Sequence, residues 1–200
     1  MADKSKVYET YNKIGSWFDN VRSKDLSFEL HHLEALTSHL QKGAKILDLG
    51  CGSGRPIAAF LLDQGFKVTA VDGSAQMIEL AKQYIPQADI RLIDMRSLNL
   101  SEKFDAIIMW HSFFHLTADD QRAIFPILEK HINPQGVLMF TSGTTLGEVW
   151  SENGGENLYH ASLDTAEYRS LLEKHHFEVL SHTVEDKTAG GATVWLARQK

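Results

Sequence analysis

The sequence predicts an α/β fold in which a mostly parallel sheet is covered by helices on both faces. Three observations indicate this class. Short apolar runs typical of buried strands alternate with helical patterns after residue 45. Most connections between these segments are short, as expected for strands joined by crossover helices. The chain has 200 residues, of which 43 % are hydrophobic, so it fits one domain with a sizeable core.

Two amphipathic helices are expected ahead of the sheet. The first is indicated by apolar or aromatic side chains at helical spacing, at Val7, Tyr11, Ile14 and Phe18. A second helical pattern follows over 26–40, and after Gly43 the period changes to that of a strand. We therefore expect a helical lid at 1–42 and a core at 43–200, which together form one domain.

The core is expected to repeat strands and helices in order. Strands are expected at 46–49, 67–71, 90–93, 104–110, 137–141, 177–184 and 193–197. Helices are expected at 57–62, 74–84, 117–131 and 164–175. Ser74 and the pair Asp164 and Glu167 supply helix caps. Because proline lacks a backbone N–H, Pro126 is expected to kink or split the third helix.

One long connection, 142–163, shows no helical or strand periodicity. It contains four glycines together with Trp150 and Tyr159. A structureless loop of this length is uncommon in a compact domain unless it binds something. We expect it to form a substrate loop whose aromatic rings, with Phe113 and Trp17, line an acceptor pocket. A surface loop without a function is the alternative.

Composition disfavours several classes of function. Lys and Arg number 20 against 26 Asp and Glu, the formal net charge is −6, and no run of five like charges occurs. Nucleic-acid readers and membrane-binding faces need clustered positive charge. No apolar run approaches the roughly 18 residues of a membrane span, and no export signal is evident. The single cysteine, Cys51, cannot form an intrachain disulfide, so a cytoplasmic location is expected.

The most informative stretch is 48–56, where a predicted strand meets a predicted helix. Glycines alternate in it at Gly50, Gly52 and Gly54. This spacing permits a sharp turn and lets a ligand approach the backbone. The dinucleotide fingerprint needs glycine where this chain has Arg55, so a pyrophosphate cradle fits less well. Asp48, just before the turn, would repel phosphate and favours a cationic ligand.

Two further carboxylates stand at the ends of predicted strands. Asp72 closes the second strand, 22 residues after Gly50, where a carboxylate can accept hydrogen bonds from a ribose diol. Asp94 follows the third strand. The joint placement of these carboxylates and the glycine loop predicts a nucleoside site.

Five segments taken together resemble the successive motifs of the class I S-adenosylmethionine-dependent methyltransferases. They are 46–54, 68–74, 93–95, 104–107 and 133–136. The resemblance covers residues 45–200. It implies a Rossmann-like, doubly wound sheet of seven strands in a three-layer αβα arrangement, with the last strand, 193–197, antiparallel. It also implies S-adenosylmethionine as the cofactor and S-adenosylhomocysteine as the product.

The same resemblance assigns residues to the methionine end of the cofactor. The three loop glycines, with Cys51 between them, would surround this end, and Asp48 would lie near its amino group. The leading helix would form a lid through Tyr11 and Trp17. Arg22 would meet the cofactor carboxylate.

At the adenosine end the resemblance implies contacts from the ends of the next strands. Asp72 would hold the ribose hydroxyls, and Gly73 or Met77 would border the adenine. Asp94 and the backbone of Met95 would recognise the adenine edge.

The segment from Trp110 to His115 is expected to face the glycine loop, with Trp110 beside the cofactor. His111, His115 and, from the long connection, His160 are the candidates for a general base, because imidazole titrates near neutrality. Alternatively, His115 only starts a helix, and methyl transfer needs no base. No metal site is expected, because Ser112 stands where an HExxH motif needs glutamate and no third ligand is evident.

The expected activity is S-adenosylmethionine-dependent methyl transfer to a small-molecule acceptor by in-line displacement. In such a reaction the enzyme chiefly holds donor and acceptor at reacting distance. An NAD(P)-dependent reductase and a module that binds S-adenosylmethionine without catalysis are the alternatives. No nucleic-acid or membrane partner is expected. The acceptor and the oligomeric state do not follow from the sequence.

Overall fold

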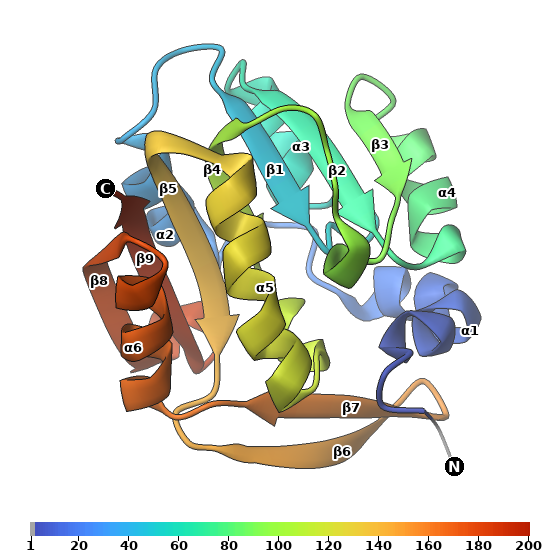
Figure 1. The fold of residues 1–200 in the computed structure, drawn as a ribbon. Helices are drawn as coiled ribbons and strands as arrows, with labels where there is room; N and C mark the ends of the chain where they lie inside the picture. Colours follow the sequence, from blue (N-terminus) through green and yellow to red (C-terminus); the bar gives the residue numbers. More distant parts are fainter. Residues whose placement is uncertain (1–2) are drawn as a thin grey trace.

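A computed structural model describes residues 3–200 as a central sheet with helices on both faces (Figure 1). The α-helices are α1 (Val7–Val21), α2 (Leu30–Thr37), α3 (Ile57–Asp63), α4 (Ala75–Tyr84), α5 (Ala118–His131) and α6 (Thr165–Lys174). The 3-10 helices are η1 (Met95–Ser97), η2 (Phe113–His115) and η3 (Lys187–Ala189). Residues 1–2, the first of the predicted lid, lie outside the described residues.

The strands form one large sheet and one hairpin. They are β1 (Lys45–Leu49), β2 (Lys67–Asp72), β3 (Asp89–Leu92), β4 (Phe104–Met109), β5 (Ile132–Ser142), β6 (Gly147–Asn153), β7 (Glu156–Ser162), β8 (Phe177–Asp186) and β9 (Ala192–Gln199). The large sheet has seven strands in the order β3-β2-β1-β4-β5-β9-β8. Neighbouring strands among β3, β2, β1, β4 and β5 pair in parallel. Strand β9 pairs antiparallel with both β5 and β8. The predicted seven-stranded sheet with an antiparallel last strand is confirmed.

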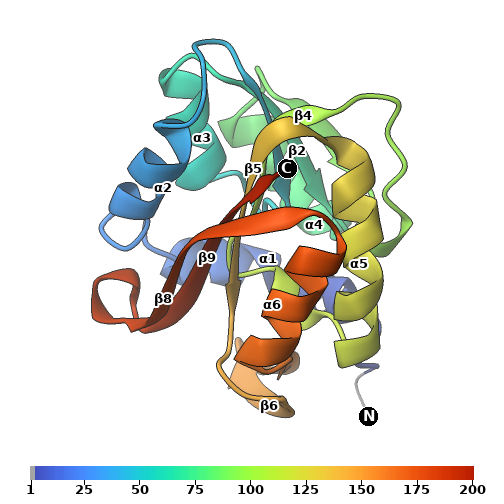
Figure 2. The ribbon, with the colours of Figure 1, turned by 60° about the vertical axis from the view of Figure 1, so that its left-hand side comes forward.

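Two apolar clusters of the described residues form the core around this sheet, one on each face. A smaller third cluster lies between α1 and β7. Residues of α2, α3 and α4 belong to one cluster and residues of α5 and α6 to the other. Figure 2 shows α2 and α3 on the opposite side from α5 and α6. Within β1, Ile46 faces the first cluster while Leu47 and Leu49 face the second. Strand side chains alternate between faces, so a strand buried on both faces needs a continuous apolar run. This explains the sequence pattern.

The segment 142–163 is an ordered hairpin and not a loop without periodicity, so that part of the prediction was wrong. β6 and β7 pair antiparallel from Gly147↔Ser162 to Asn153↔Glu156. The turn is made by Gly154 and Gly155, both with positive φ. Asn153 at the end of β6 and the two glycines after it are a hairpin signal, but β6 is so polar that its sequence does not show a strand pattern. β7 packs under α1 (Figure 1).

Two predicted helices also differ from those observed. α2 begins at Leu30 and not at 26, because Asp25 accepts hydrogen bonds from both Ser23 and Ser27 and holds a turn instead. α5 continues through Pro126 without splitting. Pro126 lies on the exposed face of α5, and its neighbours Ile124, Phe125 and Leu128 are fully buried. Tertiary packing therefore outweighs the hydrogen bond that proline cannot make.

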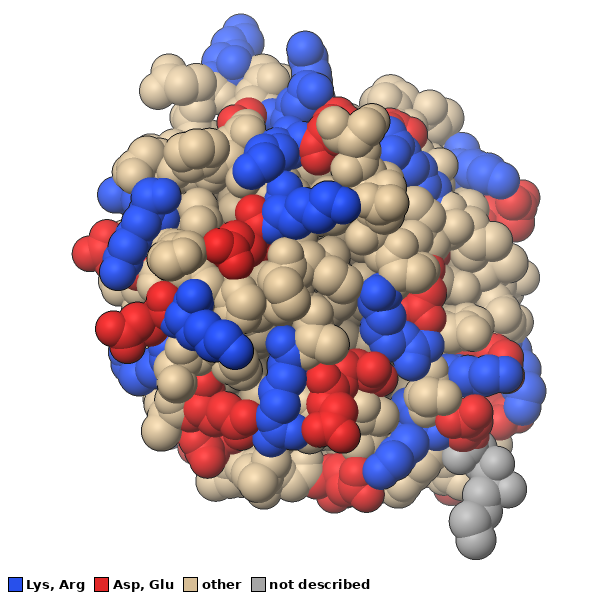
Figure 3. Space-filling model, viewed as in Figure 1, with Lys and Arg blue, Asp and Glu red and all other residues tan. Residues whose placement is uncertain are grey.

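Over residues 3–200, no helix has both the length and the apolar character needed to cross a bilayer. Basic and acidic side chains are interspersed on the face shown in Figure 3, with no continuous basic stripe on that face.

Candidate functional site

A cavity opens at the carboxyl ends of β1, β2 and β4, beneath α1. Its walls include residues from α1, the glycine loop after β1, and the turns after β2, β3 and β4. The order of the sheet places β1 beside β4, so the chain reverses its direction of strand addition at this point. Ligands of doubly wound sheets bind in the crevice formed at such a switch.

The glycine loop is held tightly by backbone contacts. Gly50 N–H and Cys51 N–H both donate to the Val71 carbonyl, at 2.7 and 3.0 Å. Gly50 has φ +84°, and a Cβ there would overlap the Cβ of Ser112 and lie 2.7 Å from its Oγ. The Ser112 hydroxyl in turn donates to the Leu49 carbonyl at 2.8 Å. Glycine is therefore required at position 50 because the segment after β4 approaches the loop so closely.

Gly54 has a different part in the loop from the other two glycines. It does not line the cavity, whereas Gly50, Cys51 and Gly52 do. A Cβ at position 54 would overlap the side chain of Ile85, which follows α4. Gly54 thus lets the loop pack against the end of α4, and its predicted place beside the cofactor is not reproduced by the geometry.

Asp72 is the carboxylate that organises the loop. Its Oδ2 accepts from Gly52 N–H at 2.9 Å, and its Oδ1 accepts from Ser74 N–H at 2.8 Å. Burial raises the pKa of Asp72, while backbone hydrogen bonds from Ser74, Gly52 and Gly73 partly offset this increase. An ionised carboxylate has about four acceptor positions, so at least one remains for a ligand.

Asp48 is a second carboxylate in the same cavity, and it is only 3 % exposed. Burial, reinforced by the charge of Asp72, raises the pKa of Asp48 to about 7, and Arg22 acts in the opposite direction. Because the carboxylate is buried beside another acid, a cation placed near Asp48 would favour its ionised form.

Asp48→Asn is expected to make the free energy of unfolding less dependent on pH. The folded-state pKa of about 7 lies above the ordinary value of 3.8, so the folded protein retains a proton that the unfolded chain has released. The free energy of unfolding should therefore fall as pH rises through 7, by about 1–2 kcal/mol from this group between pH 5.5 and pH 8. Urea denaturation of both proteins at the two pH values measures the difference. An equal pH dependence in the two proteins would contradict the raised pKa.

Helix α1 is fastened over the glycine loop through Asp19. Its carboxylate accepts from Ser53 Oγ at 2.7 Å, Arg55 Nη2 at 3.2 Å and Tyr84 OH at 3.1 Å. The Arg55 guanidinium also stacks on the Tyr84 ring. Arg55 therefore helps to hold α1 against the glycine loop. The role of Asp19 could not be predicted from the sequence, because a buried acid on an amphipathic helix is recognised only when the positions of its hydrogen-bond partners are known.

Tyr11 and Arg22, both predicted in the lid, line the cavity. Arg22 Nη2 donates to Glu29 Oε1 at 2.8 Å, which fixes the guanidinium at the end of α1. Trp17 does not line the cavity. Its ring packs against Gly154 of the hairpin and is 40 % exposed. The lid helix thus presents only part of the predicted set to the cavity.

His115 links the lid to the hairpin. Its Nδ1 lies 2.9 Å from the Tyr159 carbonyl, which can only accept, so Nδ1 carries the proton. Its Nε2 then accepts from Tyr11 OH at 3.0 Å. Burial, opposed by the backbone hydrogen bond to Tyr159 and aided by His160 and His111, lowers the pKa of His115 to about 3. With both nitrogens engaged, His115 serves as a connector of α1, η2 and β7.

The other two candidate histidines lie in different places. His111 lines the cavity, and burial, with a smaller effect from Arg22, lowers its pKa to about 4. Its backbone has φ +51° and its N–H donates to Thr141 Oγ1 at 2.9 Å, which fixes the residue at the end of β4. His160 lies outside this cavity, in a separate hollow lined also by Phe114. Among the three, His111 is best placed to meet a substrate in the cavity.

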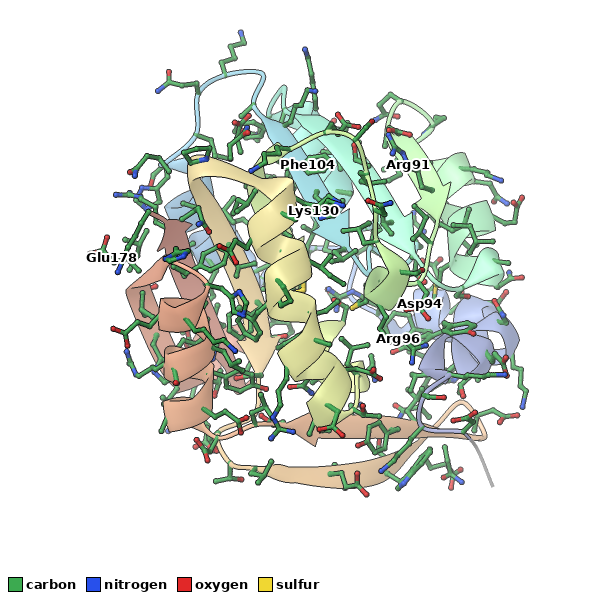
Figure 4. The ribbon with its side chains drawn as sticks, in the orientation of Figure 1. Arg91, Asp94, Arg96, Phe104, Lys130 and Glu178 are labelled. Atoms are coloured by element: carbon green, nitrogen blue, oxygen red, sulfur yellow. The ribbon has the colours of Figure 1, made fainter. Side chains whose placement is uncertain are left out.

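The adenosine-side residues predicted from the sequence come together in the cavity. Gly73, Met77, Asp94, Met95 and Trp110 all line it. Figure 4 shows Asp94 and Arg96 next to each other below the carboxyl end of β3.

Arg96 is a partner of Asp94 that the sequence analysis missed. The Arg96 backbone N–H and Nε each donate to Asp94 Oδ1 at 3.0 Å, and Arg96 Nη1 reaches Asp120 at 3.3 Å. Burial alone would raise the pKa of Asp94, but these hydrogen bonds from Arg96 hold it below its ordinary value. An Arg two residues after an acid was a signal available in the sequence.

Cys51 is unsuited to act as a nucleophile. Burial, with the charges of Asp72 and Asp48, raises the pKa of its thiol well above the ordinary value. A thiol is a poor nucleophile compared with a thiolate. Its place in the loop is therefore that of a small residue.

Comparisons with known proteins agree with this geometry. A family model described as a methyltransferase domain matches residues 46–136. A dTDP-4-amino-2,3,4,6-tetradeoxy-D-glucose N,N-dimethyltransferase of Saccharopolyspora spinosa is 26 % identical over 212 residues, which is 93 % of this chain and 85 % of the relative. A dTDP-3-amino-3,6-dideoxy-alpha-D-glucopyranose N,N-dimethyltransferase of Streptomyces fradiae is 30 % identical over 171 residues, 79 % of this chain and 66 % of the relative.

Solved structures share the fold at low identity. The 1,6-didemethyltoxoflavin-N1-methyltransferase of Burkholderia thailandensis superposes with a TM-score of 0.74 at 19 % identity, covering 100 % of this chain and 92 % of that one. An amino pentose methyltransferase of Micromonospora echinaspora gives 0.71 at 18 % identity, covering 98 % and 97 %. With the sheet order, the glycine loop and the paired carboxylates already in place, these matches show that the chain belongs to the class I S-adenosylmethionine-dependent methyltransferases.

Proposed function

We propose that this enzyme transfers a methyl group from S-adenosylmethionine to an amine nitrogen of a small-molecule acceptor. The observation that carries the proposal is one cavity lined by the buried carboxylate of Asp48, the partly buried carboxylate of Asp72, the glycine loop and the imidazole of His111. Two relatives named as amino-sugar N,N-dimethyltransferases support nitrogen as the acceptor atom.

The residues of the cavity fit this cofactor. Asp72 keeps at least one acceptor position after its backbone bonds, and a ribose hydroxyl can donate to it. Burial and the charge of Asp72 raise the pKa of Asp48, and the ammonium group that the cofactor carries would favour the ionised form of this carboxylate. When bound, S-adenosylmethionine supplies a methyl group attached to a positively charged sulfur.

Each part of the cavity is then assigned a binding role. Asp72 accepts hydrogen bonds from the ribose hydroxyls, and Asp48 pairs with the ammonium group. Arg22, already oriented by Glu29, meets the carboxylate. The Trp110 ring forms an apolar wall beside the cofactor. The backbone of the loop glycines forms another wall.

At the adenosine end, Gly73 and Met77 border the base. Asp94, which Arg96 holds in place, and the backbone of Met95 meet the adenine edge. In this assignment the acidic side chains lie beside the hydroxyl and cationic groups of the cofactor.

His111 positions the acceptor. With a pKa of about 4 the ring is neutral near pH 7, and one nitrogen offers a lone pair to an acceptor N–H. So weak a base contributes little to proton removal at neutral pH. A hydrogen bond to the amine instead orients the amine lone pair toward the methyl group, and in-line transfer depends on that orientation.

An assay with isotopically labelled S-adenosylmethionine against a panel of small amines, alcohols and thiols tests the proposal. Label should pass to amines, amino sugars among them. Transfer confined to alcohols or thiols would contradict the assignment of nitrogen, and absence of transfer to every compound class would contradict a small-molecule acceptor.

His111→Ala is expected to lower turnover about tenfold or more, because it removes a hydrogen bond worth about 0.5–1.5 kcal/mol and the orientation it imposes. The affinity for S-adenosylhomocysteine should stay within about twofold of the original, since this ring is assigned to the acceptor. His160→Ala, in the separate hollow, is the matched control. Steady-state kinetics and calorimetry check both. Full activity in His111→Ala, or equal losses in the two variants, would remove His111 from the site.

A further inference from the structure

A second cluster of polar side chains lies outside the cavity, where α2 meets the end of β8. It consists of His31 and His32 on α2 and Asp186 at the end of β8, and none of the three lines the cavity. In Figure 2 the connection between β8 and β9 lies on the same side of the sheet as α2. Asp186 lies more than 150 positions from the two adjacent histidines in the chain, so local sequence spacing does not reveal the cluster.

The ligand atoms of this cluster converge. His31 Nε2 lies 3.2 Å and His32 Nε2 3.0 Å from the same oxygen, Asp186 Oδ2. All three ligand atoms lie within 4.8 Å of one another, and the two imidazole centroids are 3.8 Å apart. With bonds of about 2.0–2.1 Å, a tetrahedral zinc ion separates its ligand atoms by about 3.3 Å. The two nitrogen-to-oxygen distances are close to that value.

The cluster is also oriented by its surroundings. The Asp186 Oδ1 atom accepts from Thr188 N–H at 2.8 Å and from Thr188 Oγ1 at 2.7 Å, which leaves Oδ2 directed at the histidines. The pairing of β8 with β9 shifts register between Thr183 and Asp186, and such bulges re-aim side chains. The His32 ring packs on Trp110. Fixed ligand orientation of this kind raises the affinity of metal sites.

We infer that His31, His32 and Asp186 form a binding site for a divalent transition-metal ion of the zinc class, with two imidazole nitrogens and one carboxylate oxygen as ligands. The side chains of His32 and Asp186 are 10 % and 12 % exposed, whereas that of His31 is 49 % exposed. The site is therefore open on the His31 side, where water completes the coordination. The bound ion joins α2 to the β8 end of the sheet.

A comparison within the same protein shows what distinguishes this cluster. Glu129 also has two histidines nearby, His175 at 2.8 Å and His176 at 3.8 Å. They approach different oxygens of the carboxylate, so their nitrogens do not converge on one point. His176 therefore supplies a matched control.

The test is a titration of untagged, chelator-treated protein with Co²⁺ and Zn²⁺. Co²⁺ is followed by its visible absorption and Zn²⁺ by competition with a chromophoric chelator. One equivalent should bind per chain. His31→Ala and Asp186→Asn should each weaken binding at least about tenfold, whereas His176→Ala should bind as the original protein does. Thermal melts without metal confirm that the variants are folded.

Binding of one equivalent that is weakened in both ligand variants supports the site. Absence of saturable binding, or binding that persists in both variants, overturns it and leaves a hydrogen-bonded His and Asp cluster. The affinity for S-adenosylhomocysteine is measured on the same samples. Because the metal ligands lie outside the cavity, failure of nucleoside binding in the original protein would contradict the proposed function without affecting the metal result.

Discussion

Gly50→Ala is expected to destabilise the protein by about 2–4 kcal/mol. Left-handed backbone costs a residue with a Cβ about 1–2 kcal/mol, and the new methyl group would also overlap Ser112. The segment after β4 cannot retreat freely, because the Ser112 hydroxyl is bonded to the Leu49 carbonyl. Urea denaturation measures the loss, and nucleoside binding should weaken with it because both segments line the cavity.

Two further variants separate backbone strain from overlap. Gly43 has φ +78° with no atom within 4 Å of an added Cβ, so Gly43→Ala should cost only the backbone strain of about 1–2 kcal/mol. Adding Ser112→Gly to Gly50→Ala removes the overlapping atoms and should restore part of the stability. Equal costs at the two glycines, or no recovery in the double variant, would show that close approach of the β4 segment does not determine residue 50.

Asp72→Ala is expected to weaken S-adenosylhomocysteine binding by about 10- to 100-fold. Hydrogen bonds to a charged acceptor contribute about 1.5–3 kcal/mol, and this carboxylate is assigned to the ribose. The same change frees Gly52 N–H, so the loop loses the bond that sets its shape. Calorimetry measures the affinity, and thermal denaturation reports any accompanying loss of stability.

The controls for Asp72 address charge and structure. Asp89→Ala removes an exposed carboxylate at the start of β3 and should leave the affinity unchanged. Asp72→Asn keeps an acceptor oxygen but loses the charge, so its affinity should lie between those of the original and the alanine variant. If Asp72→Ala binds as tightly as the original, the ribose site lies elsewhere.

The sheet could be predicted because its determinants are local and repeated. The apolar run at 46–49 indicates a strand buried on both faces. The glycines after it indicate a turn whose backbone another group can approach closely. The place of the cavity follows from the parallel sheet, since the carboxyl ends of β1, β2 and β4 must meet at one edge. Most cofactor candidates, Asp48 and Asp72 among them, therefore lie in one cavity.

Features that depend on tertiary contacts could not be predicted in this way. Trp17 and His160 have residue types suited to a site, but α1 and β7 orient them away from the cavity. The engagement of both nitrogens of His115 requires Tyr11 and the Tyr159 carbonyl, which come from two distant segments. Long-range partners of this kind leave no mark on local spacing.

Calorimetric titration of one protein preparation with S-adenosylhomocysteine and with NADH tests the central claim most directly. The arrangement of Asp48, Asp72 and the glycine loop predicts saturable one-to-one binding of S-adenosylhomocysteine and no binding of NADH. Saturable binding of NADH with no response to S-adenosylhomocysteine would contradict the account of the cavity.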